Sequence, residues 1–494
     1  MQQRAKKATA GKPTIGTGTM QTKLFIGGKW RPASDGGTFP VTDPATEETI
    51  AEVASATVDD VIEAVESAHA AGVAWAKRAP RERAEILRRS WELLSKRHEE
   101  ITEYIIRENG KAMPDARGET AYALEFFRWY AEEAVRNYGE ILTAPSGDKR
   151  IVVLQQPIGV AVLVTPWNYP AAMATRKIAP ALAAGCAVIL KPASDTPLTA
   201  LLVAEILAEA GVPDGVVNVV PSRRSGEVVS AMLHHPFVRK LSFTGSTEVG
   251  RALLKEAADT VLNTSMELGG NAPFLVFDDA DIDAAVGGAM IAKMRNGGEA
   301  CTAANRFYVH ERVADEFTDK FAKAMKALKV GRGLDPDVQL GPMVNKRAVE
   351  DIDSLVQDAT RRGSEVVTGG APLGGKGFFY PPTVLACVPK DASMLKEEIF
   401  GPVAPIVTFS DDDEAIAAAN DTEYGLIAYL FSGNLARGMR IAERIEAGMV
   451  GVNRGLVSDP AAPFGGVKQS GLGREGSHDG MMEYMEKKYI GVEW

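Results

Sequence analysis

Short apolar runs alternate with amphipathic segments over much of the chain, and this pattern predicts parallel α/β structure. Runs of four or five apolar residues are typical of strands buried in a parallel sheet. Apolar residues at three- and four-residue spacing are typical of the helices that cover such a sheet. The first series predicts strands at 160–164, 187–190, 216–220 and 240–243, followed by helices at 170–184, 197–210, 226–233 and 248–257.

A second series begins at Asn271 and predicts a second doubly wound α/β domain. Its predicted strands lie at 272–276, 306–309, 365–368, 405–409, 428–431 and 449–452, and its helices at 282–296, 314–328, 346–362, 413–419 and 435–447. Before the first series, the pattern predicts a hairpin at 24–30, helices at 58–77, 80–108 and 119–138, and a strand at 150–157 that ends in proline. That proline favours an edge strand or an excursion over a central strand.

Composition and charge exclude several classes of function. A chain of 494 residues exceeds one ordinary core, so two or three domains are expected. The net charge of −10 argues against nucleic acid or an anionic membrane as the main partner. Cys186, Cys301 and Cys387 are too few and too scattered for a disulfide framework or a zinc site, so we expect no metal and a reducing, cytoplasmic compartment. No apolar run reaches the roughly 18 residues of a membrane span.

Three stretches carry candidate chemistry. Cys301 follows two glycines between a predicted helix and a predicted strand, where backbone N–H groups can favour a thiolate. Glu267 also precedes two glycines, and Thr165-Pro166-Trp167-Asn168-Tyr169 follows the apolar run at 160–164. Each has a plain structural alternative. A lone cysteine is usually a small buried hydrophobe, and a glutamate before two glycines usually marks a turn.

Together these stretches resemble the NAD(P)-dependent aldehyde dehydrogenase family. Four further motifs agree with it in order and spacing: Leu-Lys-Pro-Ala-Ser at 190–194, Phe-Thr-Gly-Ser at 243–246, Glu-Ile-Phe-Gly-Pro at 398–402 and Pro-Phe-Gly-Gly at 463–466. The resemblance runs from about residue 23 to the end of the chain. It implies an enzyme that oxidises an aldehyde to a carboxylic acid.

The resemblance also gives each part of the chain an expected role. The predicted parts are a disordered tail (1–20), an NAD(P)-binding domain of Rossmann-like type (21–140 and 158–267), a catalytic domain that carries the thiol (268–477), and a small oligomerisation sheet (141–157 and 478–494). We therefore expect a homodimer or a homotetramer.

The family's chemistry assigns roles to three residues. Cys301, as thiolate, would attack the aldehyde. The side-chain amide of Asn168 and the backbone N–H of Cys301 match the oxyanion hole. Hydride transfer would leave a thioester, and Glu267 matches the general base for its hydrolysis. Asn168 could also be the N-cap of the helix that starts at Pro170, a role compatible with the first.

The predicted cofactor site lacks the usual G-x-G-x-x-G fingerprint. The helix start after Gly245 can still hold a pyrophosphate through backbone N–H groups and Ser246. The resemblance assigns Lys191 to the adenosine ribose, Glu398 to the nicotinamide ribose and Phe400 to the nicotinamide ring. The other candidates for cofactor binding are Thr165, Pro166, Trp167 and Ser194.

The choice between NADP and NAD depends on position 194. NAD-selective sites usually place a carboxylate on the adenosine ribose, whereas this chain has the uncharged Ser194. Arg223 and Arg224 follow the strand predicted at 216–220 and suit a phosphate, although both could be solvated loop residues. We expect NADP to be accepted at least as well as NAD.

Within the family, the chain is most similar to the succinate-semialdehyde dehydrogenases. Arg176 lies two helical turns after Asn168, and Arg295 lies six residues before Cys301. Two guanidinium groups near the thiol would hold the far carboxylate of a short aldehyde acid, with Ser458 as a third contact. The alternatives are surface salt bridges for the arginines, and glutarate semialdehyde or an uncharged aldehyde as substrate.

Three positions depart from the family pattern. Glu299 replaces the usual glutamine and could pair with Arg295 or raise the pKa of Cys301. Ala303 stands where some close relatives carry a second cysteine, so their reversible disulfide cannot form here. Arg454 stands where those relatives have an uncharged or acidic residue, which would make the pocket mouth more basic.

Two functions from other classes compete with a dehydrogenase. A cofactor-free thiol hydrolase or acyltransferase would need a histidine partner for Cys301, but all six histidines lie outside the motifs. A non-catalytic structural protein would have no need for Cys301, Glu267 and Asn168 together.

Overall fold

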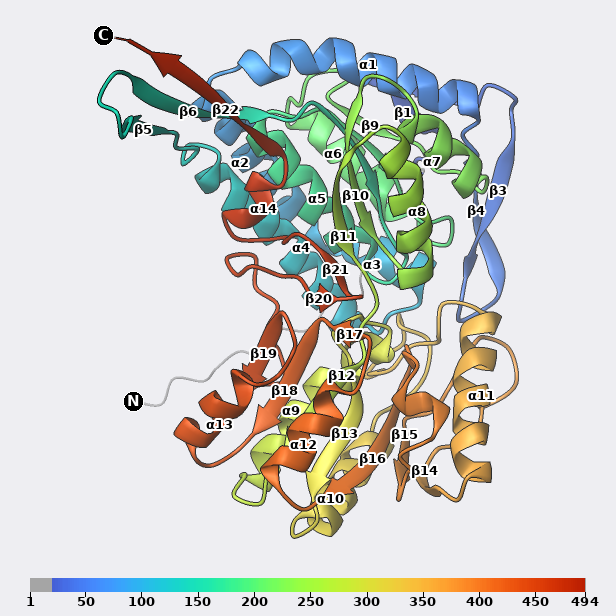
Figure 1. Ribbon diagram of the computed structural model, residues 1–494. Helices are drawn as coiled ribbons and strands as arrows, with labels where there is room; N and C mark the ends of the chain where they lie inside the picture. Colours follow the sequence, from blue (N-terminus) through green and yellow to red (C-terminus); the bar gives the residue numbers. More distant parts are fainter. Residues whose placement is uncertain (1–19, 494) are drawn as a thin grey trace, which may run out of the picture.

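The computed structural model describes residues 20–493 (Figure 1). The tail predicted at residues 1–20 therefore lies outside the described part, apart from Met20, which packs partly buried against the first core. Within residues 20–493, no helix is long and apolar enough to cross a membrane. The same residues contain no group of three or more His, Cys, Asp or Glu side chains that could hold a metal ion.

An eight-stranded sheet forms the first α/β half, in the order β2-β1-β9-β8-β7-β10-β11-β21. Its five central strands, β9, β8, β7, β10 and β11, run parallel. On one side β1 pairs antiparallel with β9 and β2 antiparallel with β1, and on the other side β21 pairs antiparallel with β11. The strands are β1 (Leu24–Ile26), β2 (Lys29–Arg31), β7 (Val160–Val164), β8 (Val188–Lys191), β9 (Val217–Val219), β10 (Val238–Thr244), β11 (Asn263–Glu267) and β21 (Gly471–Leu472).

Helices cover both faces of this sheet, as the alternation predicted. In β7, Val162 packs with one set of helices and the next residue, Leu163, packs with the other, because successive strand side chains point to opposite faces. One face carries α1 (Val58–Lys77), α7 (Ser225–Leu233) and α8 (Thr247–Asp259). The other carries α2 (Pro80–Lys96), α3 (His98–Asn109), α4 (Met113–Glu133), α5 (Pro170–Ala184) and α6 (Leu198–Glu209).

The helix predicted at 80–108 is wrong as a single element. It divides into α2 and α3 at Arg97, whose backbone leaves the helical region (φ −98°, ψ 20°). Arg97 pairs with Glu100 (2.6 Å) and with Glu205 of α6 (2.9 Å). No proline or glycine marks the break, and both helices bury their apolar stripe in the same core, so the periodicity continues across it.

A seven-stranded sheet forms the second α/β half, in the order β14-β15-β16-β13-β12-β18-β19. Every neighbouring pair is parallel except β14 with β15. The strands are β12 (Ala272–Val276), β13 (Ala304–His310), β14 (Glu365–Thr368), β15 (Thr383–Ala386), β16 (Val403–Phe409), β18 (Ile427–Phe431) and β19 (Met449–Val452). Helices α9 (Ile282–Met294) and α10 (Ala314–Lys326) pack on one face, and α11 (Lys346–Arg361), α12 (Asp412–Asn420) and α13 (Leu435–Ala442) on the other. The predicted fold class is confirmed.

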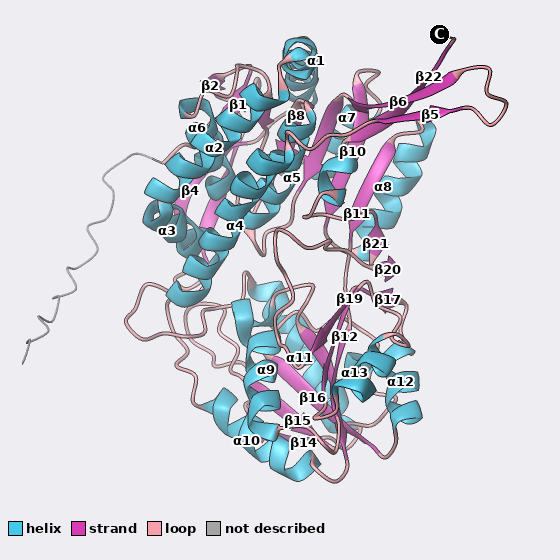
Figure 2. Ribbon diagram, turned by 90° about the vertical axis from the view of Figure 1, so that its left-hand side faces the viewer, coloured by secondary structure: helices cyan, strands magenta, loops and turns pink. Residues whose placement is uncertain are grey.

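A small antiparallel sheet, β22-β6-β5, extends from one corner of the molecule (Figures 1 and 2). It comprises β5 (Glu140–Thr143), β6 (Arg150–Pro157) and β22 (Met485–Val492), which joins the chain end to β6 as predicted. Pro157 lies at the end of β6, and β6 is the middle strand of this excursion. The minor elements are β3 (Thr38–Asp43), β4 (Glu48–Ala54), β17 (Tyr424–Gly425), β20 (Val467–Lys468), α14 (Asp479–Met482) and the 3₁₀ turns η1 (Arg295–Gly298) and η2 (Ser393–Leu395).

The two α/β halves face each other across the loops that carry the predicted site (Figure 2). Strands β7, β10 and β11 run parallel in register and end at Val164, Thr244 and Glu267. Ligands of such sheets bind at the carboxyl ends of the strands. The second half contributes η1 and Cys301, so the chemistry lies between the halves.

Candidate active site

A cleft of about 230 Å³ lies where the two halves meet. Predicted site residues from both halves line it, namely Pro166, Trp167, Asn168, Gly245, Ser246, Cys301, Glu398 and Phe400. Larger hollows of about 350 Å³ beside β16 and about 460 Å³ beside α1 contain none of the predicted site residues. The cleft is therefore the candidate active site.

Close backbone packing holds the loop that carries Cys301. The chain turns sharply in η1, where Asn296 (φ 55°) and Gly297 (φ 62°) are left-handed. A Cβ on Gly270 would lie 2.4 Å from the carbonyl oxygen of Cys301, and one on Gly298 would lie 2.2 Å from the carbonyl oxygen of Gly401. The glycines after Glu267 therefore do more than make a turn, because only a glycine at 270 lets the two segments touch.

The surroundings of the Cys301 thiol oppose its ionisation in the free protein. Burial raises its pKa to about 12. Arg176 opposes this increase, Glu398 and Glu267 add to it, and Arg295 also opposes it. Desolvation thus opposes the expected thiolate more strongly than the nearby positive charges favour it.

Glu267 ends β11 with its carboxyl group buried beside the Cys301 loop. Burial raises its pKa well above the usual value, and the negative charge of Glu475 raises it further. Arg176 and Lys177 act in the opposite direction. Its Oε2 has no hydrogen-bond partner within the described chain. This environment favours the neutral carboxyl group, and the ionised carboxylate is a stronger base than that of an ordinary glutamate.

Asn168 is held on both its main chain and its side chain. Its carbonyl oxygen accepts from Lys111 Nζ (2.6 Å) and from Asn296 Nδ2 (3.0 Å). Its Nδ2 donates to the carbonyl oxygen of Glu299 (3.0 Å). One N–H of the amide therefore fixes the group, and the other remains for a ligand.

Asn168 is not the N-cap of α5. The N-cap is Tyr169, which makes no side-chain capping bond. Glu119 of α4 provides the missing capping bonds, because the Oε1 of Glu119 accepts from the N–H groups of Ala171 (2.9 Å) and Ala172 (3.2 Å). Glu119 also forms a buried ion pair with Lys111. Sequence reasoning missed Lys111 and Glu119, since nothing in the sequence around them indicates that they reach the site.

The first half offers a cradle for a phosphate-bearing cofactor. Ser246 is the N-cap of α8, whose first turn faces the cleft with Gly245 before it. Thr244 lines the same cleft, and its hydroxyl group is buried with no hydrogen-bond partner among residues 20–493. Free N–H groups at a helix start and an unpaired hydroxyl are donors that suit a pyrophosphate, so the residues fit the expected dinucleotide.

The second half supplies the other wall of this cradle. Phe400 has a left-handed backbone (φ 51°), and its ring meets Trp167 edge-on at 5.4 Å. Glu398 Oε1 accepts from the N–H of Gly270 (3.2 Å). Burial raises the pKa of Glu398 to about 8, although Gly270 and Lys293 both act to lower it. Glu398 and Phe400, the two residues predicted to contact the nicotinamide end of the cofactor, thus lie in the same wall of the cleft.

Lys191 and Thr165 lie together at the strand ends. The N–H of Thr165 donates to the carbonyl oxygen of Lys191 (3.2 Å). Lys191 Nζ donates to Ser225 Oγ at the start of α7 (2.6 Å), and burial lowers its pKa to about 8. Lys191 is therefore buried and hydrogen-bonded, whereas Ser194 is partly exposed.

The two arginines expected near the adenosine end have protein partners. Arg224 pairs with Asp35 (2.8 Å), and both side chains are exposed. The guanidinium group of Arg223 lies 6.0 Å from the ring of Phe39. A surface pair of this kind contributes little and exchanges readily, so Arg224 can be recruited by a phosphate.

Arg176 is buried in α5, not in a surface salt bridge. It forms an ion pair with Glu475 and lies 4.2 Å from the ring of Phe464. Its Nη2 is buried without a hydrogen-bond partner in the described part of the chain. Glu475 also pairs with Lys177 (2.6 Å). Sequence reasoning missed Glu475, because nothing in the sequence near it shows that it reaches α5.

Arg295 is partly buried near the thiol, and Glu299 does not neutralise it. Its Nη2 donates to Thr302 Oγ1 (3.2 Å), and its guanidinium group lies 5.8 Å from the ring of Tyr169. The carboxyl group of Glu299 instead accepts from the N–H of Val344 (3.0 Å). The suggested Glu299–Arg295 pair is therefore wrong.

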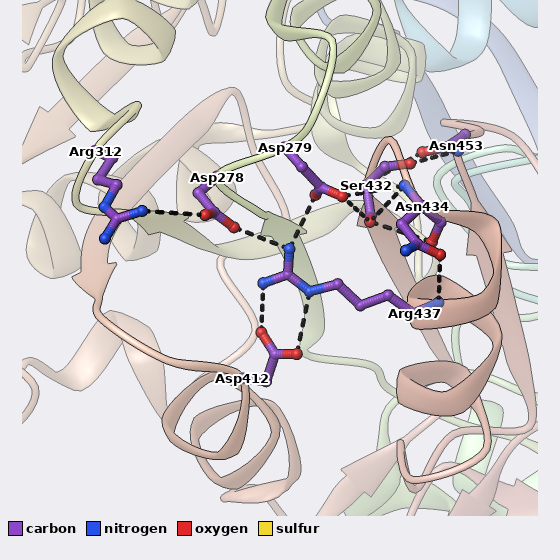
Figure 3. A network of polar contacts seen from close by, with 8 residues as sticks. All are labelled: Asp278, Asp279, Arg312, Asp412, Ser432, Asn434, Arg437 and Asn453. Carbon is purple, nitrogen blue, oxygen red and sulfur yellow. Dashed lines mark hydrogen bonds and ion pairs between the residues drawn. The ribbon is translucent and has the colours of Figure 1, made fainter.

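An arginine network joins α12, α13 and the loop after β12 (Figure 3). Arg437 of α13 pairs with Asp412 of α12 (2.5 Å) and, in the loop after β12, with Asp278 (2.9 Å) and Asp279 (3.1 Å). Three carboxylates around one guanidinium group make a network, which holds its geometry better than an isolated surface pair. The network ties α12 and α13 to the end of β12.

The loop that carries Ser458 starts from this network. Asn453, left-handed after β19 (φ 52°), exchanges two 3.0 Å hydrogen bonds with the main chain of Ser432 (Figure 3). Ser432 Oγ bonds Asp279 (3.0 Å). Ser458 is partly buried further along the loop, and the exposed Arg454 donates to the carbonyl oxygen of Leu456 (3.0 Å).

Comparison of the sequence with known protein families identifies the family of this chain. The sequence model of the aldehyde dehydrogenase family matches residues 30–490. The chain belongs to the aldehyde dehydrogenase family. It is therefore an enzyme that oxidises aldehydes, and the thiol hydrolase and the non-catalytic protein are excluded.

Similar members of the aldehyde dehydrogenase family act on semialdehydes. A succinate-semialdehyde dehydrogenase of Paenarthrobacter nicotinovorans is 56% identical over 443 residues, which is 90% of this chain and 98% of that protein. A glutarate-semialdehyde dehydrogenase of Pseudomonas aeruginosa is 48% identical over 468 residues, 95% of this chain and 97% of that one. A crystal structure described as an Escherichia coli NADP-dependent enzyme has a TM-score of 0.95 and 45% identity, and covers 96% of this chain and 98% of its own.

Proposed function

We propose that this aldehyde dehydrogenase oxidises succinate semialdehyde to succinate, with Cys301 as nucleophile, Asn168 as oxyanion donor and Glu267 as general base. The observation that carries the proposal is the pair of arginines near the thiol, of which Arg176 is buried and Arg295 is partly buried. Arg176 and Arg295 come from different halves, and both act to lower the pKa of Cys301. A short aldehyde acid would bring its aldehyde carbon to Cys301 and its carboxylate to these charges.

The first step is attack of the Cys301 sulfur on the aldehyde carbon. The S–H bond breaks and its proton passes to solvent water, a C–S bond forms, and the carbonyl π electrons move to oxygen. The free N–H of the Asn168 amide and the backbone N–H of Cys301 stabilise the new oxyanion. Arg176 and Arg295 favour the thiolate needed for the attack.

The residues around the cleft would bind the nicotinamide dinucleotide and exclude water. Ser246 and the first turn of α8 would hold the pyrophosphate, and Glu398 and Phe400 the nicotinamide ribose and ring. When bound, the nicotinamide accepts the hydride that the thiohemiacetal carbon gives up. The product on Cys301 is then a thioester.

Glu267 would complete the cycle by activating water. Its ionised carboxylate takes a proton from the water as the oxygen attacks the thioester carbon. Collapse of that adduct breaks the C–S bond and releases the acid. Glu475 sits beside Glu267 with Arg176 and Lys177 as counterions, so it stays ionised and keeps the Glu267 carboxylate basic.

Arg295→Met tests substrate recognition most cleanly. The change removes a charge-assisted contact but keeps a long apolar side chain, so KM for succinate semialdehyde should rise about tenfold or more, at roughly 1.5–3 kcal/mol per contact. KM for an uncharged aldehyde of similar length should stay within about twofold. Equal losses for both aldehydes would make Arg295 a structural residue.

Arg176→Met is expected to behave differently. Because Arg176 also pairs with buried Glu475, its loss leaves a buried carboxylate with only Lys177, and activity with both aldehydes should fall. Combining it with Glu475→Gln should restore the uncharged aldehyde more than succinate semialdehyde.

Glutarate semialdehyde is the second candidate substrate, because a relative of that name is 48% identical over 95% of this chain. Steady-state kcat/KM for both semialdehydes and an uncharged aldehyde decides between them. A higher kcat/KM for glutarate semialdehyde would replace the proposed substrate with its longer homologue.

NADP should be accepted at least as well as NAD. Lys191 and Ser194 supply positive charge and a hydroxyl group, and Arg224 is available on an exposed pair. Ser194→Glu should therefore lower kcat/KM for NADP about tenfold relative to NAD by like-charge repulsion. A wild-type preference for NAD above about tenfold would contradict the assignment.

We also propose that two copies associate through β5, β6 and β22. Ile141, Leu142 and Tyr489 of this sheet are 68%, 49% and 57% exposed, which suits an interface more than a monomer surface. Sedimentation of the full chain measures the state of association.

The proposal also includes the domain division given above. It includes a cytoplasmic location as well, because all three cysteines are free.

A further inference from the structure

Glu299 connects three segments around the thiol. Its carbonyl oxygen accepts from Asn168 Nδ2 (3.0 Å) and from Asn296 Nδ2 (2.8 Å). Its carboxyl Oε1 accepts from the N–H of Val344 (3.0 Å). Only 2% of the residue is exposed, so none of these bonds competes with bulk water.

The segment that holds the Glu299 side chain is itself firmly packed. A Cβ on Gly341 would lie 2.0 Å from the carbonyl oxygen of Gly110, so the backbones touch there. The N–H of Met343 donates to the carbonyl oxygen of Phe378 (2.8 Å). Val344 therefore offers the Glu299 side chain a fixed donor.

The Cys301 loop needs such an anchor. Asn296 and Gly297 are both left-handed, and the loop leaves η1 with one main-chain bond from the N–H of Glu299 to Asn296 (3.0 Å). A shift of the Glu299 carbonyl oxygen would reorient the side-chain amide of Asn168, which donates to it. A misplacement of about 1 Å can cost up to about a hundredfold in rate.

We propose that Glu299 is a positioning residue for Asn168. The hydrogen bond from the N–H of Val344 to the Glu299 carboxyl group fixes Glu299, and the carbonyl oxygen of Glu299 then orients the oxyanion-binding amide of Asn168. The inference rests on the proposed function, because it takes Asn168 as the oxyanion donor. It assigns a role to a position where this chain differs from the usual glutamine.

The environment of Glu299 indicates which substitutions should preserve this role. Burial raises the pKa of Glu299 to about 8, with the Val344 N–H and Lys111 acting against the increase. Near pH 7 the side chain is therefore mostly neutral. Glutamine has nearly the same shape, is neutral and keeps an acceptor for Val344, whereas methionine keeps the volume and removes the acceptor.

The test compares Glu299→Gln with Glu299→Met. We expect E299M to lower kcat roughly tenfold with little change in the aldehyde KM, and E299Q to stay within roughly threefold of wild type. Glu299→Ala repeats the test if E299M does not fold. Equal losses in E299Q and E299M, or no loss in E299M and E299A, would overturn the inference.

Glu108 provides a matched control for effects on folding alone. Burial raises its pKa to about 8, and it accepts from the N–H groups of Leu198 (2.7 Å) and Thr199 (2.9 Å) in α6. Glu108→Met should lower thermal stability without the loss of kcat. A tenfold loss of kcat in E108M as well would attribute the E299M effect to general destabilisation and overturn the inference.

A double-mutant cycle with Asn168→Ala separates the inference from the proposed function. If Glu299 acts through Asn168, E299M should cost less than about threefold in the N168A background. If E299M costs the same tenfold there, Glu299 does not act through Asn168 and the inference fails while the oxyanion assignment stands. If N168A alone keeps wild-type turnover, the oxyanion assignment itself fails, and the inference with it.

Discussion

Replacing Cys301 with alanine should reduce aldehyde oxidation by at least about 10⁴-fold, because the thiohemiacetal and the thioester both depend on its sulfur. Cofactor binding should persist, since the cleft wall formed by Gly245, Ser246 and Trp167 is unchanged. Steady-state turnover measured by nicotinamide absorbance, together with a cofactor titration by fluorescence, checks both parts.

Cys387→Ser is the matched control for this experiment. Cys387 is exposed and lies outside the cleft, so its loss should leave turnover within about twofold. Retention of more than about a tenth of wild-type turnover in Cys301→Ala would remove Cys301 as the nucleophile.

The free protein offers an independent check on Cys301. Because burial raises the thiol pKa to about 12, the thiolate fraction below that pH should rise about tenfold for each pH unit. The rate of alkylation by a small neutral reagent should rise in the same way between pH 7 and pH 9. A rate that is flat across this interval would show that the thiol is already ionised in the free protein.

Glu267→Gln should block release of the product more than its formation. Glutamine keeps the shape of the side chain but cannot take a proton from water, so steady-state turnover should fall at least about a hundredfold. A rapid-mixing experiment should still record a burst of reduced nicotinamide close to one per active site. Disappearance of the burst would mean that Glu267 acts before or during hydride transfer.

The pH dependence of deacylation tests the same residue in the wild-type protein. Burial and Glu475 raise the pKa of Glu267, so the neutral form predominates at low pH and the basic form increases as the pH rises. The deacylation rate should therefore increase with pH up to that raised pKa. The increase should vanish in Glu267→Gln; if it persists there, another group is the base.

The sequence alone determined the fold class and the residue types of the site. Helix and strand periodicity depends on which residues are buried, so α1 at Val58–Lys77, α5 at Pro170–Ala184 and β7 at Val160–Val164 were predicted to the residue. Motifs also identified Cys301, Glu267 and Asn168 as candidates, because those stretches are contiguous in the chain.

Local patterns failed where the deciding contact came from another element. The break between α2 and α3 falls at Arg97, which pairs with Glu205 of α6. Strand β11 escaped prediction because its first residues, Asn-Thr-Ser, are polar and its place in the sheet comes from pairing with β10. Neither partner lies within a helical turn of the residues concerned.

Only the tertiary structure decided the state of the site. The raised pKa values of Cys301 and Glu267 and the pairing of Arg176 with Glu475 all follow from desolvation and from charges that are distant in sequence. Glu299 could have faced Arg295, four residues away, yet it bonds Val344, 45 residues on. Electrostatics and hydrogen bonding act through space, so the order of residues alone did not determine them.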